Sequence, residues 1–182
     1  LGEMIKIGRR GSLTGKLIIF GLQGHVAYPA RANNPSTIIV NILKELKDIK
    51  FDKGTKDFQP TNLEVTRINI NNTADNVVPA IAEATFNIRF NNKHSSTTLK
   101  KKLNKIFRKI NKKHKSKFEI KYRVSGEAFL TKTDETTFMI QNVIKKITKL
   151  KPKLSTTGGT SDLRFIRTIC PGLEFGLVGK TM

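Results

Sequence analysis

The segment from residue 81 to residue 90 constrains the fold most, because its side chains alternate strictly between two kinds. One set is small or apolar and the other is mostly polar: Ala82, Ala84, Phe86, Ile88 and Phe90 against Ile81, Glu83, Thr85, Asn87 and Arg89. A period of two predicts a β-strand in a sheet that is covered on one face and open on the other. Arg89 is therefore expected on the open face.

Three more strands and two helices are predicted around this strand. Strands are expected at 13–20, at 63–70 with a slip near Arg67 that suggests a bulge, and at 118–124. Asn34 and Pro35 begin one amphipathic helix, and a second runs through the basic segment after Lys93. The order βαββαβ predicts a four-stranded antiparallel sheet with two helices on one face.

The pattern changes after Ser125-Gly126-Glu127. A helix is expected from Asp134 to about Pro152, followed by a glycine-rich stretch at 155–162, a short helix at 163–168 and a buried strand at 173–178. Because a βαββαβ unit already has a core, we expect this tail, with the residues before Gly11, to form part of a second, incomplete α/β layer with exposed apolar surface. The predicted segments are 1–10, 11–127 and 128–182, and the fold class is α/β with an α+β insertion.

The chain is strongly basic, with a formal net charge of +20. Eleven Lys or Arg residues and no acid lie between Lys93 and Lys117, but apolar residues recur there at helical spacing, which indicates a solvated helix face. Without interleaved aromatic residues or a nucleic-acid-binding motif, the charge alone is a weak argument for nucleic acid. The short apolar runs predict no membrane segment, and the lone Cys170 fits a cytoplasmic location.

His25 is the side chain best placed for chemistry, because it follows a predicted strand and lies between glycines and an aromatic-proline turn. It could donate to a developing negative charge, or it could simply be a loop histidine with a local hydrogen bond. His94, His114 and the single cysteine form no metal-ligand pattern, so no metal site is expected within this chain. The remaining candidates are anion-binding groups: Arg9-Arg10-Gly11-Ser12, Arg89 and Gly158-Gly159-Thr160-Ser161.

Taken in order, six segments resemble the M20 metallopeptidase family, and within it the branch that desuccinylates N-succinyl-LL-2,6-diaminopimelate. The six segments are 8–14, GLQGHVAYP at 21–29, DNVVP at 75–79, FNIRF at 86–90, SGEAFL at 125–130 and TTGGTSD at 156–162. The resemblance spans the whole chain and is most specific at 21–29 and 156–162.

The resemblance implies an α/β catalytic domain that holds two zinc (or cobalt) ions, interrupted by a lid domain through which two subunits form a homodimer. The implied reaction is hydrolysis to succinate and LL-2,6-diaminopimelate, a step of lysine and cell-wall synthesis, in which the metals and a glutamate activate water. By this resemblance, the family's zinc ligands and catalytic glutamate would lie upstream of Leu1, and a last metal-binding histidine directly after Met182. The chain is therefore expected to bind no metal and to be inactive by itself.

The resemblance also implies roles for particular residues. His25 would reach across the dimer to stabilise the oxyanion, and Tyr28 and Asn76 would line the same contact. The implied substrate-binding groups are Arg9, Arg89, Gly159 and Thr160 for the succinyl carboxylate, and Ser125 and Arg164 for the diaminopimelate end. Asp75 and Gly179 depart from the family pattern. Two alternatives stay open: another M20 amidohydrolase, such as an acetylornithine deacetylase or aminoacyl peptidase, and a basic nucleic-acid-binding module.

Overall fold

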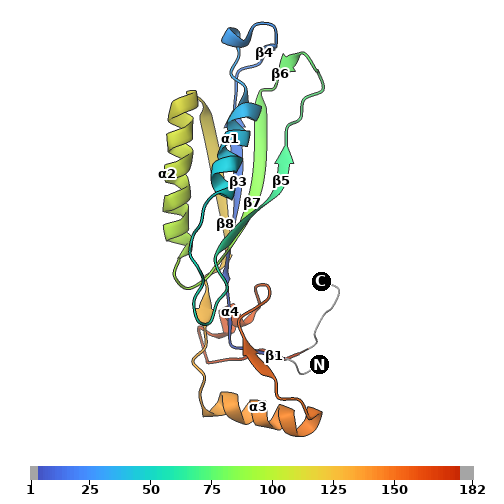
Figure 1. Ribbon diagram of the computed structural model, residues 1–182, viewed down its shortest axis with the longest axis vertical. Coiled ribbons are helices and arrows are strands. Elements are labelled where there is room, and N and C mark those ends of the chain that lie inside the picture. The colour runs from blue at the N-terminus through green and yellow to red at the C-terminus, as the bar shows by residue number, and fades with distance from the viewer. Residues whose placement is uncertain (1–3, 177–182) are drawn as a thin grey trace.

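The structure, a computed structural model, describes residues 4–176 as an elongated molecule (Figure 1). A helix-covered sheet occupies residues 11–127, which we call the sheet unit; residues 4–10 and 128–176 form a smaller part, which we call the base. The elements are β1 Met4–Lys6, β2 Gly8–Arg9, β3 Gly11–Phe20, β4 Gly24–His25, η1 Pro29–Arg31, α1 Pro35–Lys47, β5 Asn62–Asn69, β6 Val77–Val78, β7 Ile81–Phe90, α2 Ser96–His114, β8 Lys117–Gly126, β9 Phe129–Leu130, α3 Glu135–Thr148, β10 Lys153–Ser155 and α4 Leu163–Ile166.

The sheet unit is built on four antiparallel strands in the order β5-β7-β3-β8. Helix α1 packs on β7, β3 and β5, α2 packs on β8 and β3, and the two helices touch each other, so both cover the same face. The register of β5 against β7 shifts between Val65 and Arg67, where the sequence indicated a bulge. The four strands and two helices lie in the predicted ranges.

The core lies between this sheet and the two helices. The apolar set of β7 is fully buried, and Phe86 packs against Phe107 of α2. Two glycines on β3 make room for large rings, because a Cβ at Gly11 or Gly15 would lie within 2.3 Å of the Phe90 or Phe86 ring. The pairing of glycine with phenylalanine across two strands lets the helices approach the sheet closely.

Local hydrogen bonds define where the two helices begin. The Asn34 side chain accepts from the Ser36 amide at 2.9 Å, and Pro35 occupies the first turn of α1. Ser95 and Thr98 form a reciprocal capping box at the start of α2. The Asn34-Pro35 start is the one that the sequence predicted.

The base consists of two short strand pairs and two helices. Strand β1 pairs in parallel with β10, and β2 pairs antiparallel with β9. Its buried cluster contains only Ile5, Ile7 and Ile144, while most apolar side chains of α3 are exposed, as for Ile147 at 75%. Apolar exposure was expected for this part of the chain.

Two predictions for the base differ from the structure. Helix α3 ends at Thr148, because Lys149 adopts a left-handed conformation, so the helix stops short of Leu150 and Pro152. The described part of the predicted strand at 173–178 forms one bridge, between Glu174 and Lys6, and its other residues lie outside the described range. Gly179 also lies outside the described residues. Within residues 4–176, no helix is long and apolar enough to cross a membrane.

Candidate functional site

His25 lies at the far end of the sheet unit from the base, which we call the tip: strands β4 and β6 with η1 (Figure 1). The Nδ2 atom of Asn76 lies 3.5 Å from the Nε2 atom of His25, and the Tyr28 ring centroid lies 6.0 Å from that of His25. All three side chains are exposed. The structure therefore brings together the three residues that were predicted to share one contact.

The backbone sets the protonation of the His25 ring. The Ala27 amide donates to Nδ1 of His25 at 3.1 Å, so the neutral ring carries its proton on Nε2. The side-chain amide of Asn76 lies beside that N–H, and its oxygen is the atom that would accept from it. Both side chains are exposed at the tip, where a group from outside can reach His25.

Hydrogen bonds hold the loop that carries Asn76. The Asn72 side chain donates to the carbonyls of Ala74 and Val77 at 3.0 and 2.8 Å, and the Val26 amide donates to the Asn76 carbonyl at 3.0 Å. Asp75, which departs from the family pattern, is exposed in the same turn. Hydrogen bonds therefore hold the loop that carries Asn76 in place against the segment that carries His25.

Arg9 and the glycine-rich loop lie at the opposite end of β3, in the base. The Arg9 Nη1 atom donates to the Thr157 carbonyl at 2.7 Å, and Nε donates to Glu174 at 2.9 Å. Gly158 has a φ of +105°, and a Cβ there would lie 2.3 Å from Nη1 of Arg9. Only glycine fits this position, and the next residue, Gly159, faces open space.

A second group of predicted residues crosses the sheet beside the base. Ser12 on β3 pairs with Arg89 on one side and Gly126 on the other, so these residues form one row. A Cβ at Gly126 would lie 2.9 Å from Cδ of Arg164, which places Arg164 beside the end of β8, where Ser125 lies. The Nε atom of Arg164 is buried and has no hydrogen-bond partner among the described residues.

Positive charge gathers around these groups. Burial lowers the pKa of Lys6, and the neighbouring Arg9 lowers it further, while Glu174 opposes the shift. Burial and then Arg89 lower the pKa of Arg10. Each shift indicates cations that are close and partly desolvated, an arrangement that attracts carboxylates.

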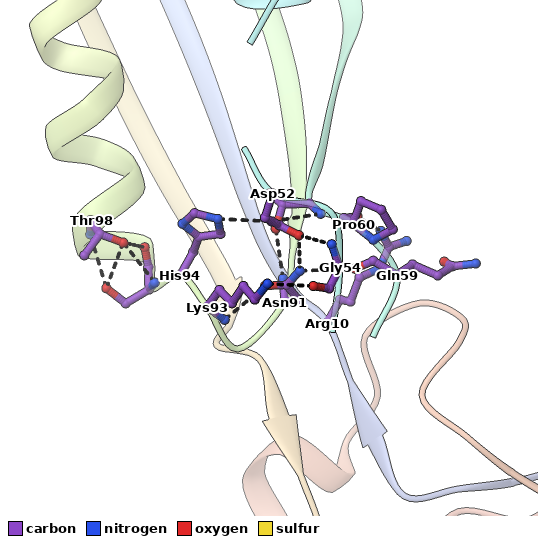
Figure 2. A network of polar contacts seen from close by, with 11 residues as sticks. Arg10, Asp52, Gly54, Gln59, Pro60, Asn91, Lys93, His94 and Thr98 are labelled. Carbon is purple, nitrogen blue, oxygen red and sulfur yellow. Dashed lines mark hydrogen bonds and ion pairs between the residues drawn. The ribbon is translucent and has the colours of Figure 1, made fainter. Parts of the chain in front are cut away.

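Sequence reasoning missed a polar network around Asp52, which Figure 2 shows. Oδ1 of Asp52 accepts from Gly54 at 2.5 Å and from Asn91 at 2.7 Å, and Oδ2 accepts from Thr61 at 3.2 Å. Nε2 of His94 lies 3.1 Å from Oδ2. Burial raises the pKa of Asp52, but the hydrogen bonds outweigh burial and lower it to about 2. The network fastens the loop 51–61 to the end of β7.

This loop also joins the sheet unit to the base. Arg10 donates from Nη1 to the Pro60 carbonyl at 3.1 Å and to Asn62 at 2.8 Å, and the Thr156 hydroxyl donates to the Asp57 carbonyl. The only hint in the sequence was an aspartate two positions before a glycine in a connecting segment. Residues separated by about forty positions cannot be paired by local patterns.

The predicted site residues thus lie in two separate groups, one around His25 at the tip and one around Arg9 in the base. Strand β3 has ten residues, which corresponds to about 33 Å of extended chain between base and tip. His25 cannot reach the Arg9 region of its own chain over that distance. The described residues contain no cluster of three or more His, Cys, Asp or Glu side chains that could hold a metal ion.

Solved structures define the class of this fold. The chain resembles a tripeptidase from Staphylococcus aureus (TM-score 0.77, 17% identity, 94% of this chain and 44% of that one). It also resembles the aminopeptidase PepT from Bacillus cereus (TM-score 0.76, 17% identity, 94% and 45%) and an M20 family metallo-carboxypeptidase from Sulfolobus solfataricus (TM-score 0.71, 16% identity, 93% and 51%). The chain therefore shares its fold with part of each of these three proteins.

The family follows from the sequence of the sheet unit. Residues 7–115 match the model of the M20 peptidase dimerisation domain. The match covers more than half of the chain, which therefore belongs to the M20 peptidase family.

Curated relatives of higher sequence identity share one enzyme name. The chain is 76% identical to the succinyl-diaminopimelate desuccinylase of Pelagibacter ubique (strain HTCC1062) over 100% of this chain and 47% of that protein. It is 48% identical to the enzyme of the same name from Phenylobacterium zucineum (strain HLK1), over 100% of this chain and 48% of that protein. The chain spans about half the length of these relatives.

Proposed function

We propose that the chain is the lid and second catalytic-domain segment of a succinyl-diaminopimelate desuccinylase, a cytoplasmic enzyme that hydrolyses N-succinyl-LL-2,6-diaminopimelate. In this proposal, residues 1–10 end the first catalytic segment, 11–127 form the lid, and 128–182 begin the second. The names of the relatives, which match the chain along its whole length, support the reaction. The placement of the predicted residues supports their division between two ends of the molecule.

The base supplies groups suited to a substrate with several carboxylates. Arg9 lies against the Gly158–Thr160 loop, so its guanidinium and the Gly159 amide can bind a succinyl carboxylate together, with the Thr160 hydroxyl nearby. Arg89 adds charge from the sheet, and Arg164 lies beside Gly126, the residue after Ser125, for the diaminopimelate end. The unpartnered Nε of Arg164 fits an acceptor that comes with the substrate.

The single observation that carries the mechanism is the exposed position of His25 at a tip far from the base, with its Nδ1 accepting from the Ala27 amide. An exposed Nε2–H group can stabilise an oxyanion, which strengthens as a hydrogen-bond acceptor in the transition state. Because β3 separates the tip from its own base, the oxyanion must belong to a site in a second copy. His25 therefore acts in trans in this proposal.

The two edges of the sheet differ as surfaces for a second copy. Strand β8 carries Lys117, Lys121 and Arg123 against one acidic residue, Glu119, and this net positive charge would repel the same edge of another chain. Strand β5 exposes Val65 and Ile68. We therefore place the homodimer contact at the β5 edge.

The metal ions of the proposed enzyme, two zinc or cobalt, have no fitting ligand cluster in residues 4–176. When bound elsewhere in the enzyme, they would supply activated water. This chain's own contribution is to orient the substrate through its carboxylates and to donate a hydrogen bond from His25.

The first test is substrate selectivity of the complete polypeptide. We expect hydrolysis of the succinylated amine to exceed that of the acetylated amine, and Arg9→Ala to remove most of this preference. Lys132→Ala, a change of an exposed base lysine outside the predicted site, is the matched control. Preference for the acetylated amine would favour the deacetylase alternative.

The second test is mixing of two inactive variants. One carries His25→Ala and the other Arg9→Ala, and each is assayed alone and after random reassociation at low substrate concentration. If His25 acts in trans, half of the dimers are mixed and each has one intact site, so activity returns to about a quarter of wild type. If His25 acts within its own chain, mixing restores nothing.

A further inference from the structure

Glu174 has no role in the resemblance, yet its carboxylate contacts the guanidinium of Arg9. The Nε and Nη2 atoms of Arg9 both donate to Oε2 of Glu174, from Nε at 2.9 Å. The Arg9 and Glu174 side chains are only 15% and 24% exposed. The pair is therefore a charge-assisted contact that is largely shielded from water.

The donors that this contact uses determine which ones remain. A guanidinium has five N–H groups. Glu174 receives two of them, and the Thr157 carbonyl receives one from Nη1 at 2.7 Å. Among the described residues, one N–H remains on each Nη atom. Two N–H groups on one guanidinium can both donate to a carboxylate.

The backbone fixes Glu174 independently of its side chain. The Glu174 amide donates to the Lys6 carbonyl at 3.0 Å, and the Lys6 amide donates to the Glu174 carbonyl at 2.8 Å. This bridge holds the segment against β1. The carboxylate thus reaches Arg9 from a fixed Cα, and removing it leaves the backbone bridge intact.

Charge does not argue against an anion at this place. Lys6 lies beside the pair, with its Nζ atom donating to Thr157 Oγ1 at 2.8 Å. Lys6, Arg9 and Glu174 together carry one positive charge. Glu174 therefore orients Arg9 without cancelling the attraction for a carboxylate.

We propose that Glu174 is a positioning residue that holds Arg9 so that its two remaining N–H groups receive the carboxylate of the substrate's acyl group. The inference rests on the proposed function. Without Glu174 the guanidinium can rotate about its side-chain bonds, and its two remaining N–H groups are no longer pre-organised for the carboxylate. Acyl groups with a carboxylate should depend on Glu174, and neutral acyl groups should not.

The test measures kcat and KM of the complete polypeptide for succinylated and butyrylated forms of one amine. In Glu174→Ala we expect the KM for the succinylated amine to rise about tenfold with kcat changed less than about twofold, because uniform binding is lost. The KM for the butyrylated amine should stay unchanged. Glu174→Gln keeps an acceptor for Arg9 and should restore most of the wild-type KM.

Controls separate this inference from the proposed function. Glu83→Ala removes another carboxylate, the half-buried partner of Lys16 at 2.9 Å, and should change neither KM. If Glu174→Ala changes both substrates equally, or neither, Glu174 does not position Arg9. If Arg9→Ala itself leaves the succinyl preference intact, the proposed carboxylate site is wrong. Loss of preference in Arg9→Ala but not in Glu174→Ala overturns only the role of Glu174.

Discussion

The sheet unit and the base use the same kinds of elements but differ in how much core they enclose. Among the described residues, the sheet unit buries sixteen apolar residues in one cluster between four strands and two helices, whereas the cluster of the base holds three, with Phe129 and Leu163 buried outside it. In the sheet unit every strand finds its partner within residues 11–127, but β1 and β10 pair across nearly 150 residues and have few neighbours. The difference teaches that the contacts holding the sheet unit together lie within it, whereas α3 leaves most of its apolar side chains exposed.

The largest effect should come from emptying the core of the sheet unit. Phe86→Ala removes a fully buried ring that lies over Gly15, a residue with no side chain to fill the space. We expect the free energy of unfolding of the 182-residue chain to fall by about 3–5 kcal/mol. Denaturant unfolding followed by circular dichroism measures the change.

The matched change in the base is Ile144→Ala. Ile144 is buried to a similar degree but belongs to a cluster of three. The main transition should shift little, because the base contributes little to it. A shift as large as that of Phe86→Ala would mean that the two parts unfold as one unit.

The next largest effect concerns the Asp52 network, which attaches the loop 51–61. The pKa of Asp52 is about 2 in the folded state, below the ordinary value, so the carboxylate stabilises the fold above about pH 4. That contribution, about 2–3 kcal/mol, should be lost as the pH falls from about 4 to 2. Asp52→Asn should lower stability at neutral pH and flatten this part of the pH profile. An unchanged profile would mean that Asp52 is not the titrating group.

A smaller effect should separate the two capping boxes. Ser95→Ala removes the cap of α2, which packs on the sheet, and should lower the stability of the main transition by about 1 kcal/mol. Asp134→Ala removes the equivalent cap of α3 in the base and should leave that transition in place. Hydrogen exchange should instead show faster exchange confined to α3. Equal shifts for both variants would contradict the separation of the two parts.

The smallest effect is expected on the exposed face of α3. Ile147 is 75% exposed, so Ile147→Gln should change the free energy of unfolding of the isolated chain by less than about 0.5 kcal/mol. In the complete polypeptide the same change should cost more, because further protein would cover this face. Thermal unfolding of both forms measures the difference.

Periodic patterns made most of the sheet unit predictable. The alternation in β7 reports a sheet with one covered face, and Asn34 with Pro35 reports a helix start, because these signals arise from the local chain. The slip near Arg67 was readable for the same reason. The resemblance of two short segments, 21–29 and 75–79, to family motifs predicted that His25, Tyr28 and Asn76 share one contact.

Contacts between distant segments could not be predicted. The partner of His94 is Asp52, and the partner of Arg9 is Glu174, 165 positions away. No local pattern links such pairs. The segment around Glu174 was predicted as a buried strand from its apolar residues, but its described part forms one bridge, to Lys6. Burial in the base depends on neighbours that local periodicity does not report.

The unbroken strand β3 has a mechanical consequence. Its ten residues make a stiff arm of about 33 Å between the tip and Arg10, where the base joins the sheet unit and which we call the neck. A rotation of only about 10° at the neck would move the His25 ring by about 6 Å, more than the width of a hydrogen bond. The contacts of the loop 51–61 with Arg10 and Thr156 lie at the base end of β3, where such a rotation would start. A small displacement at this end therefore becomes a large displacement of His25.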